Sequence, residues 1–168
     1  MSEVPEGLNL APPSRGMPRP SVTLTLTRDG TDGVEVLLGR RSETMRAFPG
    51  YWAFPGGGVS RVDSTASEIL GIPVQHCAIL REVVEELGLA PHGGKMVAVE
   101  DDFRSMVVED KSNWFPLALD GDIPCETEGI RVISMRTTPP FSPMRFENTF
   151  LHIHANDHDD FSLIGQTE

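Results

Sequence analysis

The chain has 168 residues, 39% of them hydrophobic, and carries 25 Asp and Glu against 14 Lys and Arg, a formal net charge of -11. This length fits about one domain with a buried core. So acidic a chain repels nucleic acid and anionic membranes, which bind proteins through their phosphates. The sequence also contains no apolar run of the roughly 20 residues that span a bilayer. We therefore expect no nucleic-acid or membrane partner.

Two further features of the sequence concern its compartment. The N-terminus has neither the basic start nor the apolar core of a signal peptide. Cys77 and Cys125 are solitary, so we expect buried thiols rather than disulfides or cysteine metal ligands. Both features favour a cytoplasmic protein.

The first 60 residues predict an arm followed by short strands. Residues 1–20 contain five prolines, which indicates a flexible N-terminal arm before a single domain at 21–168. That domain stops abruptly after a turn-like segment, which suggests truncation at the C-terminus. Residues 21–30 alternate apolar residues with threonine, and 34–41 return across a turn as the second strand of a hairpin. A short aromatic strand at 51–59 then breaks at a proline into three glycines.

The remaining chain predicts helices and then strands. We expect a helical turn at 64–71, because Thr65 and Glu68 have capping-box spacing. A longer helix over about 74–87 should end at Gly88. Further along we expect a helix at 99–119 and strands at 130–136 and 147–155.

The helix expected at 74–87 has an acidic face. Its apolar stripe is Leu80, Val83, Val84 and Leu87, and the opposite side carries Glu82, Glu85 and Glu86. Carboxylates at i, i+3 and i+4 repel one another. A solvated helix face is one interpretation. The other is a site for Mg²⁺ or Mn²⁺, which prefer oxygen ligands, and the glycine turn at 56–58 would let backbone carbonyls approach such an ion.

The glycines and the acidic helix together resemble the Nudix box, Gly-x5-Glu-x7-Arg-Glu-U-x-Glu-Glu-x-Gly-U, where U is aliphatic. "GGGVSRVD" places Gly57 at the first glycine and Asp63 at the first acid, and "REVVEELGL" matches every specified position of the second half. The chain departs from the box by having aspartate at 63 and 17 residues at 64–80 where the box has seven. The resemblance covers roughly 22–155. It implies an α/β protein with the Nudix fold, an α/β/α sandwich around a mixed β-sheet.

A second run narrows the resemblance to one subgroup. "LLGRRSETMRAFPGYWAFPGG" at 37–57 resembles the segment before the box in Nudix coenzyme A diphosphatases, with Gly39 replacing a threonine. The insertion within the box is similar to that of the larger, peroxisomal-type branch. By this resemblance, Arg41 and Arg46 bind substrate phosphates, together with Arg40 and Gly57.

The family resemblance also implies a metal site and catalytic roles. Mg²⁺ or Mn²⁺ would be held by Glu82, Glu85, Glu86 and the carbonyl of Gly56. Arg81 would pair with Glu85 to hold the carboxylates in place, and Asp63 would help to orient that pair. We assign catalysis to Glu86, Glu85 and Arg81. The general base stays open between Glu86 and a later carboxylate such as Glu147.

The implied enzyme hydrolyses a diphosphate, and the expected partner is a small-molecule nucleoside diphosphate. Coenzyme A or acyl-CoA would give 3′,5′-ADP and 4′-phosphopantetheine or its acyl form. Nucleotide sugars, dinucleoside polyphosphates, ADP-ribose and NADH are rival substrates. A non-catalytic Nudix-fold binding module is the alternative class, and homodimer formation is left open.

A histidine cluster near the C-terminus offers a different site. His152 and His154 lie at H-x-H spacing, followed by Asp157, His158 and Asp159. Two histidines on one strand face are a reasonable start for zinc. We favour an ordinary strand followed by a solvated turn, because the resembling metallo-β-lactamase-type hydrolases need further ligands far downstream.

Overall fold

The computed structural model describes residues 16–44, 49–142 and 144–155. Its main sheet has the strand order β2-β1-β9-β8, and β5 pairs with the same side of β1 as β2. The parallel pair is β1 with β9, and the other pairs are antiparallel, so the sheet is mixed. The strands are β1 (Arg19–Gly30), β2 (Gly33–Val36), β5 (Gly56–Gly58), β8 (Arg131–Thr137) and β9 (Phe146–Ala155).

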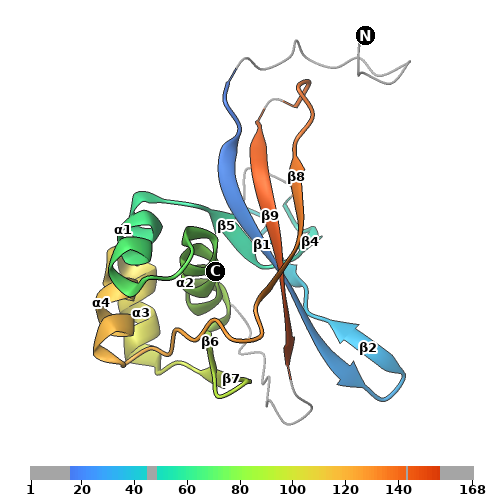
Figure 1. The fold of residues 1–168 in the computed structure, drawn as a ribbon. Helices are drawn as coiled ribbons and strands as arrows, with labels where there is room; N and C mark the ends of the chain where they lie inside the picture. Colours follow the sequence, from blue (N-terminus) through green and yellow to red (C-terminus); the bar gives the residue numbers. More distant parts are fainter. Residues whose placement is uncertain (1–15, 45–48, 143, 156–168) are drawn as a thin grey trace.

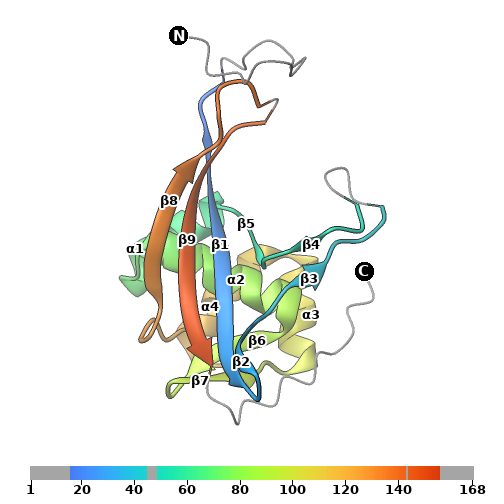
Figure 2. The ribbon, with the colours of Figure 1, turned by 90° about the vertical axis from the view of Figure 1, so that its right-hand side faces the viewer.

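The α-helices of the described residues all lie on one side of this sheet, as Figures 1 and 2 show. They are α1 (Arg61–Leu70), α2 (Val74–Leu87), α3 (Asp101–Glu109) and α4 (Trp114–Asp120), with a 3-10 turn at Lys111–Asn113. Two small ribbons complete the fold: β3 (Gly39–Arg40) with β4 (Trp52–Ala53), and β6 (Leu89–His92) with β7 (Lys95–Ala98).

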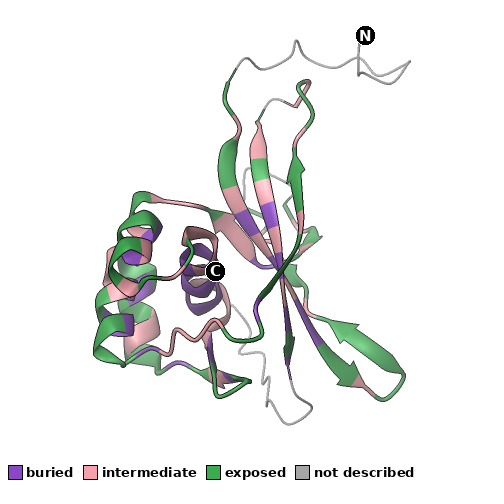
Figure 3. Cartoon of the chain, in the orientation of Figure 1, coloured by how far each residue is buried: buried purple, intermediate pink, exposed green. Residues whose placement is uncertain are grey.

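The core forms between the sheet and α2. Alternate residues of β1 (Val22, Leu24 and Leu26) are buried, because successive side chains of a strand point to opposite faces. The central part of α2, residues 77–84, is buried, and Figure 3 shows it between the sheet and the other helices. This helix is enclosed because α1, α3, β1, β5 and β6 all contact it. The segment with the acidic face is therefore the central helix of the domain.

The α/β class and the mixed sheet are confirmed. The helix expected at 74–87 has these bounds, and Gly88 ends it in the left-handed conformation with φ 65°. The strands expected at 21–30, 130–136 and 147–155 correspond to β1, β8 and β9. The expected sandwich has a helical layer on each side of the sheet. Within the described residues (16–44, 49–142 and 144–155), the helices form one layer, on the side of the sheet where α2 lies.

Several element bounds were predicted wrongly. The helical turn expected at 64–71 is the second half of a longer helix, and its capping box uses Ser60 and Asp63 rather than Thr65 and Glu68. The N–H of Ser60 donates to Asp63 Oδ2 over 2.7 Å. The Ser60–Asp63 pair caps the helix because the Asp63 carboxylate also has a buried ionic partner, described below.

The other errors are splits and one omission. The strand expected at 34–41 divides into β2 and β3, because the chain leaves β1 after Leu37 and pairs instead with β4. The strand at 51–59 divides likewise into β4 and β5. The helix expected at 99–119 is interrupted at Asp110, whose side chain accepts a hydrogen bond from the backbone of Ser112. The β6–β7 hairpin was not predicted.

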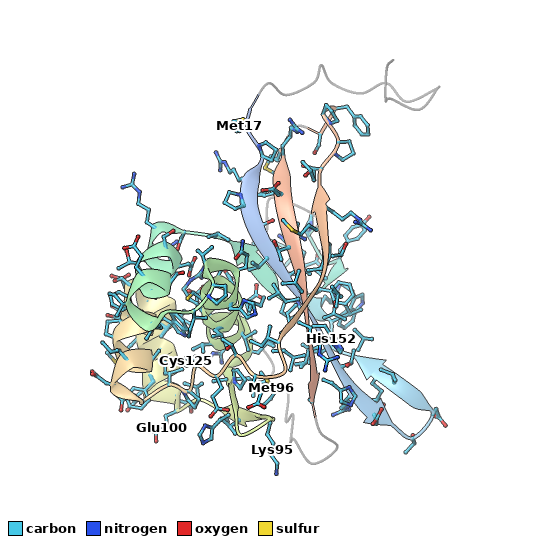
Figure 4. All side chains as sticks on the ribbon, in the orientation of Figure 1. Met17, Lys95, Met96, Glu100, Cys125 and His152 are labelled. Atoms are coloured by element: carbon cyan, nitrogen blue, oxygen red, sulfur yellow. The ribbon has the colours of Figure 1, made fainter. Side chains whose placement is uncertain are left out.

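Three further expectations concerned the N-terminal arm, the two cysteines and membrane-spanning segments. Residues 1–15 of the expected arm lie outside the described residues, and β1 begins at Arg19. Cys77 is a buried free thiol and Cys125 a partly buried one, and Figure 4 shows Cys125 beside the helical layer. No described helix is long and apolar enough to cross a membrane.

Candidate metal and diphosphate site

A single buried guanidinium organises the candidate site. Arg81, 2% exposed, forms a bidentate ion pair with Asp63, with Nε to Oδ1 at 2.7 Å and Nη2 to Oδ2 at 3.0 Å. Its Nη1 donates to Glu82 Oε1 at 2.9 Å and to Glu85 Oε1 at 3.0 Å. Nη2 also donates to the carbonyl of Gly58 at 3.2 Å. Arg81 thereby joins α1, α2 and β5 at one point.

This network confirms two expected contacts. The Arg81–Glu85 pair forms at i+4 as predicted, and Asp63 reaches Arg81 although 17 residues separate them in the sequence. The extra residues of the box fold as the rest of α1, the turn at Gly71 and the first turns of α2. The insertion therefore leaves the acid–arginine contact intact.

The glycine turn fits closely against the carboxylates. Gly56 has φ 147°, and a Cβ at this position would meet Thr23 Cα at 2.9 Å and the carbonyl oxygen of Val22. A Cβ on Gly57 would meet the Glu82 carboxylate, 2.6 Å from Oε2. Only glycine fits at these two positions without movement of β1 or of Glu82.

The backbone of Gly56 faces the acidic cluster. In the β1–β5 ladder, Leu24 N–H donates to Pro55 and Val59 N–H donates to Pro20. Because hydrogen-bonded pairs alternate along an antiparallel ladder, Gly56 and Gly58 turn their polar groups away from β1. The N–H of Gly56 accordingly donates to Glu86 Oε2 at 2.9 Å. Its carbonyl points to the same edge of the strand, which is the side where a bound cation would lie.

Burial sets the acidity of the cluster. The pKa of Glu86 is raised from 4.5 to about 7, mainly by burial and further by the charges of Glu82 and Glu85, while the Gly56 hydrogen bond and the charge of Arg41 act in the opposite direction. The pKa of Glu82 is also raised, because burial outweighs its contact with Arg81. Burial alone would lower the pKa of Arg81, but its hydrogen bond to Asp63 and the surrounding carboxylates raise it.

The donor chemistry fits a hard cation. Asp63, Glu82 and Glu85 pair with the single buried Arg81, and the charges of Glu82 and Glu85 also act on Glu86. Carboxylates therefore outnumber cations here, and oxygen is the ligand that Mg²⁺ and Mn²⁺ prefer. Within the described residues, no group of three His, Cys, Asp or Glu side chains is gathered closely enough to form a ready metal site. Arg81 holds one oxygen of Glu82 and one of Glu85, which leaves Oε2 of each carboxylate.

Comparison with known proteins decides the family. The NUDIX domain family model matches residues 17–133, more than half of the chain. The chain belongs to the Nudix family. It is similar to the crystal structure of a NUDIX hydrolase from Alicyclobacillus acidocaldarius, with a TM-score of 0.73 and 25% identity over 85% of this chain and 72% of that one. Nudix hydrolases generally use divalent metals, and this protein is a Nudix hydrolase with the Nudix fold.

A second structural match supports the fold alone. A MutT/nudix family protein from Enterococcus faecalis has a TM-score of 0.53 and 19% identity, over 88% of this chain and 40% of that one. The comparison with curated proteins finds no match.

Of the predicted phosphate-binding arginines of this Nudix protein, Arg40 ends β3 and Arg41 directly follows it. Arg41 is near enough to Glu86 for its charge to lower the pKa of that carboxyl. Arg40 is exposed and bonds to Glu43 at 2.9 Å. Arg46 lies outside the described residues. Glu147 is an exposed residue of β9, separated from β5 by β1.

One residue beside the Nudix helix was not predicted. Arg104 of α3 donates to the carbonyls of Glu85 (3.2 and 3.4 Å) and Glu86 (3.4 Å). Carbonyls in the last turn of a helix lack hydrogen-bond partners within the helix. A cation at this end also interacts favourably with the negative end of the helix dipole. Arg104 therefore fixes the end of α2 that carries two of the glutamates. The sequence offered one weak signal for this role: an arginine within the helix expected at 99–119. Nothing in the sequence connected that arginine with the helix at 74–87.

The histidines form a separate polar group on the sheet. Figure 4 shows His152 at the strands, away from Cys125 and the helices. Thr27 Oγ1 lies 2.9 Å from His152 Nε2 and 3.0 Å from His154 Nδ1, and Asp29 Oδ2 lies 3.6 Å from His154 Nε2. Residues 156–168, including His158, lie outside the described residues. These contacts fit the strand interpretation.

Proposed function

We propose that this protein hydrolyses the diphosphate bond of a nucleoside-diphosphate-linked small molecule in an Mg²⁺-dependent or Mn²⁺-dependent reaction, with coenzyme A or acyl-CoA as substrate. The observation that carries the proposal is the acidic cluster around Arg81 against the Gly56–Gly58 turn. Its excess negative charge suits a cation, and a diphosphate needs one because its own charge repels a nucleophile.

The proposed ligands are Glu82, Glu85, Glu86 and the Gly56 carbonyl. When bound, the metal ion supplies charge neutralisation and lowers the pKa of water. Arg81 has a positioning role, because its Nε, Nη1 and Nη2 all donate to protein groups. It holds the carboxylates at fixed separations rather than contacting substrate.

Glu86 is the proposed general base. One of its oxygens, Oε2, accepts the Gly56 N–H, which leaves Oε1 to take a proton from water. The water oxygen forms a bond to phosphorus, the bond from that phosphorus to the bridging oxygen breaks, and the leaving phosphate departs with that oxygen.

Coenzyme A as substrate rests on the run at 37–57. Its resemblance to coenzyme A diphosphatases includes both Arg41 and Arg46, and the charge of Arg41 acts to lower the pKa of Glu86. In so acidic a chain, cations next to a glycine turn favour binding of an anion. Hydrolysis of coenzyme A would release 3′,5′-ADP and 4′-phosphopantetheine.

Product identification tests this proposal. The protein is incubated with coenzyme A, acetyl-CoA, ADP-ribose, a nucleotide sugar and NADH, each with Mg²⁺ or with EDTA, and the products are separated by chromatography. We expect 3′,5′-ADP from the coenzyme A substrates in Mg²⁺ alone. Faster hydrolysis of ADP-ribose or NADH would refute the substrate assignment. Mg²⁺-dependent binding of these ligands with no turnover would instead indicate a binding module.

Glu85→Gln tests the metal assignment. Glutamine keeps the size of the side chain but removes a ligand charge, so turnover at saturating Mg²⁺ should fall by at least about a hundredfold while the fold survives. Glu68→Gln is the matched control, because Glu68 is an exposed residue of α1. Near-normal turnover of Glu85→Gln would falsify the metal role.

A further inference from the structure

The strand β8 forms an open edge of the main sheet. The strand order ends at β8, which pairs only with β9 among the described strands. In Figure 2 it lies at the edge of the sheet opposite β2. All residues of β8 except Ser134 are exposed. An edge of this kind presents backbone N–H and carbonyl groups with which another chain can pair.

The strand register identifies the backbone groups that face this edge. The N–H of Thr138 donates to the carbonyl of Phe146 at 2.9 Å, next to the Thr137–Glu147 pair. Because hydrogen-bonded and non-hydrogen-bonded pairs alternate along an antiparallel ladder, Met135 and Thr137 turn their polar backbone groups away from β9. The guanidinium of Arg136 accordingly reaches the Met135 carbonyl, at 3.0 Å. The N–H of Met135 is therefore directed to the open edge.

The side chains of β8 differ between the two faces of the sheet. Val132 and Met135 are paired with buried residues of β9 on the helix side, whereas Arg131 and Arg136 are paired with residues of β9 that point away from the helices. Directly opposite residues project to the same face. The exposed fractions of Val132 and Met135 are 52% and 54%. The edge therefore combines cations on one face with accessible apolar side chains on the other.

The two arginines of β8 are not matched by acids. Within the described residues, neither Arg131 nor Arg136 forms an ion pair with a carboxylate. Residues 130–155 contain three arginines and one glutamate, so this part of the sheet is locally positive in a chain of net charge -11. A partner that carries carboxylates would complement this charge.

We propose that the β8 edge is a docking site for an extended peptide of a partner protein in which acidic and apolar residues alternate. The peptide would lie beside β8 as an additional strand and pair with the backbone of Met135 and Thr137. Because successive side chains of a strand point to opposite faces, its acids would lie on the face of the two arginines and its apolar residues on the face of Val132 and Met135. This surface shares no residue with the metal and diphosphate site, so the inference goes beyond the proposed function.

A second copy of the chain fits this edge less well. Two-fold pairing of β8 with itself would bring Arg131 and Arg136 of both copies to one face, without an acid among the paired residues. Like charges on neighbouring strands are destabilising. An acidic peptide instead supplies the charge that the edge lacks.

Binding of designed peptides tests the inference. The probe is a fluorescently labelled peptide of eight residues that alternates valine with glutamate, and fluorescence anisotropy gives its Kd for the full chain. One control peptide has lysine in place of glutamate. A second control has methyl groups on its backbone nitrogens, so it cannot donate hydrogen bonds to a strand. Both controls should bind at least about tenfold more weakly than the probe.

Substitutions in β8 test the two contacts separately. Met135→Pro removes the N–H directed to the open edge, a change that edge strands tolerate, and should raise Kd for the probe about fivefold. Met135→Val keeps the N–H and should change Kd less than about twofold. Arg136→Gln should raise Kd about threefold, with a smaller effect at high salt. Thermal unfolding of each variant establishes that the domain remains folded.

Three results would overturn the proposal. Equal binding of the glutamate and lysine peptides would exclude charge recognition, and binding that survives backbone methylation would exclude strand pairing. Absence of probe binding at concentrations up to about 1 mM would exclude the site itself. A dimer seen by analytical ultracentrifugation that Met135→Pro dissociates would assign the edge to a second copy, and it would overturn the peptide site as well.

Discussion

Replacing Glu86 by glutamine should stabilise the metal-free protein above pH 7. Burial and neighbouring carboxylates raise the pKa of Glu86 from 4.5 to about 7. One pKa unit corresponds to about 1.36 kcal/mol, so keeping Glu86 ionised in the folded state costs about 3 kcal/mol. Glutamine removes this charge and keeps an oxygen for the Gly56 N–H. Because its amide is also buried, we expect a net gain of about 1–3 kcal/mol in the free energy of unfolding.

The sign of the pH dependence follows from the raised pKa. Between about pH 4.5 and pH 7, the unfolded chain releases the Glu86 proton before the folded protein does. This group therefore contributes stability below pH 4.5 that is lost as the pH rises through about 7. The advantage of Glu86→Gln over wild type should be small at pH 5 and largest at pH 8.

Chemical denaturation in EDTA at pH 5 and pH 8 measures both effects. Glu68→Gln, a change on the exposed side of α1, serves as control. Adding Mg²⁺ at pH 8 should stabilise wild type more than Glu86→Gln, because the ion compensates a charge that the variant lacks. A variant less stable than wild type in EDTA at pH 8, or equally stabilised at both pH values, would refute the account of a desolvated, repelled carboxylate.

Three further predictions concern other parts of the cluster. Gly57→Ala should push the Glu82 carboxylate aside and weaken Mg²⁺ binding about tenfold, as measured by calorimetry. Gly58→Ala is the control and should leave Mg²⁺ binding unchanged, because a Cβ at this position meets nothing within 4 Å. Equal effects of the two substitutions would exclude the steric explanation. Asp63→Ala leaves the buried guanidinium of Arg81 without its bidentate partner. The free energy of unfolding, measured by urea denaturation, should fall by about 3–5 kcal/mol. A loss below about 1 kcal/mol would be incompatible with a buried ion pair. Arg104→Gln should lower kcat more than it raises KM, with Arg104→Lys partly restoring kcat; a change in melting temperature alone would limit this residue to a structural role.

The sequence predicted the elements whose signals are local. The helix α2 has an apolar stripe and a glycine that ends it, so its bounds were predicted correctly. The alternation of apolar residues with threonine in β1 likewise revealed its buried face. The Arg81–Glu85 pair followed from helical spacing. In each case the determining residues are close in the sequence.

The prediction errors arose where contacts between residues distant in the sequence determine the structure. Both Ser60–Asp63 and Thr65–Glu68 have capping-box spacing, and the contact of Asp63 with Arg81 selects the first. Helical periodicity showed the acidic face but not that β5 covers it, so the burial of Glu82 and Glu86 could not be predicted.

The β6–β7 hairpin and the role of Arg104 were missed for different reasons. Gly93 and Gly94 have φ 59° and 74°, as a two-residue turn requires, but Pro91 weakens the strand pattern beside them. Arg104 acts on backbone carbonyls, which no side-chain motif encodes.

The ion pair between Asp63 and Arg81 explains how the box tolerates its insertion. Its two partners are brought together by packing of α1 against α2, so no fixed number of residues is needed between them. Treated as a flexible loop, lengthening the connection from seven to the 17 residues at 64–80 costs only about 0.8 kcal/mol of closure entropy. A search pattern that fixes this spacing would overlook such chains, whereas one that requires an acid able to reach the arginine would retain them.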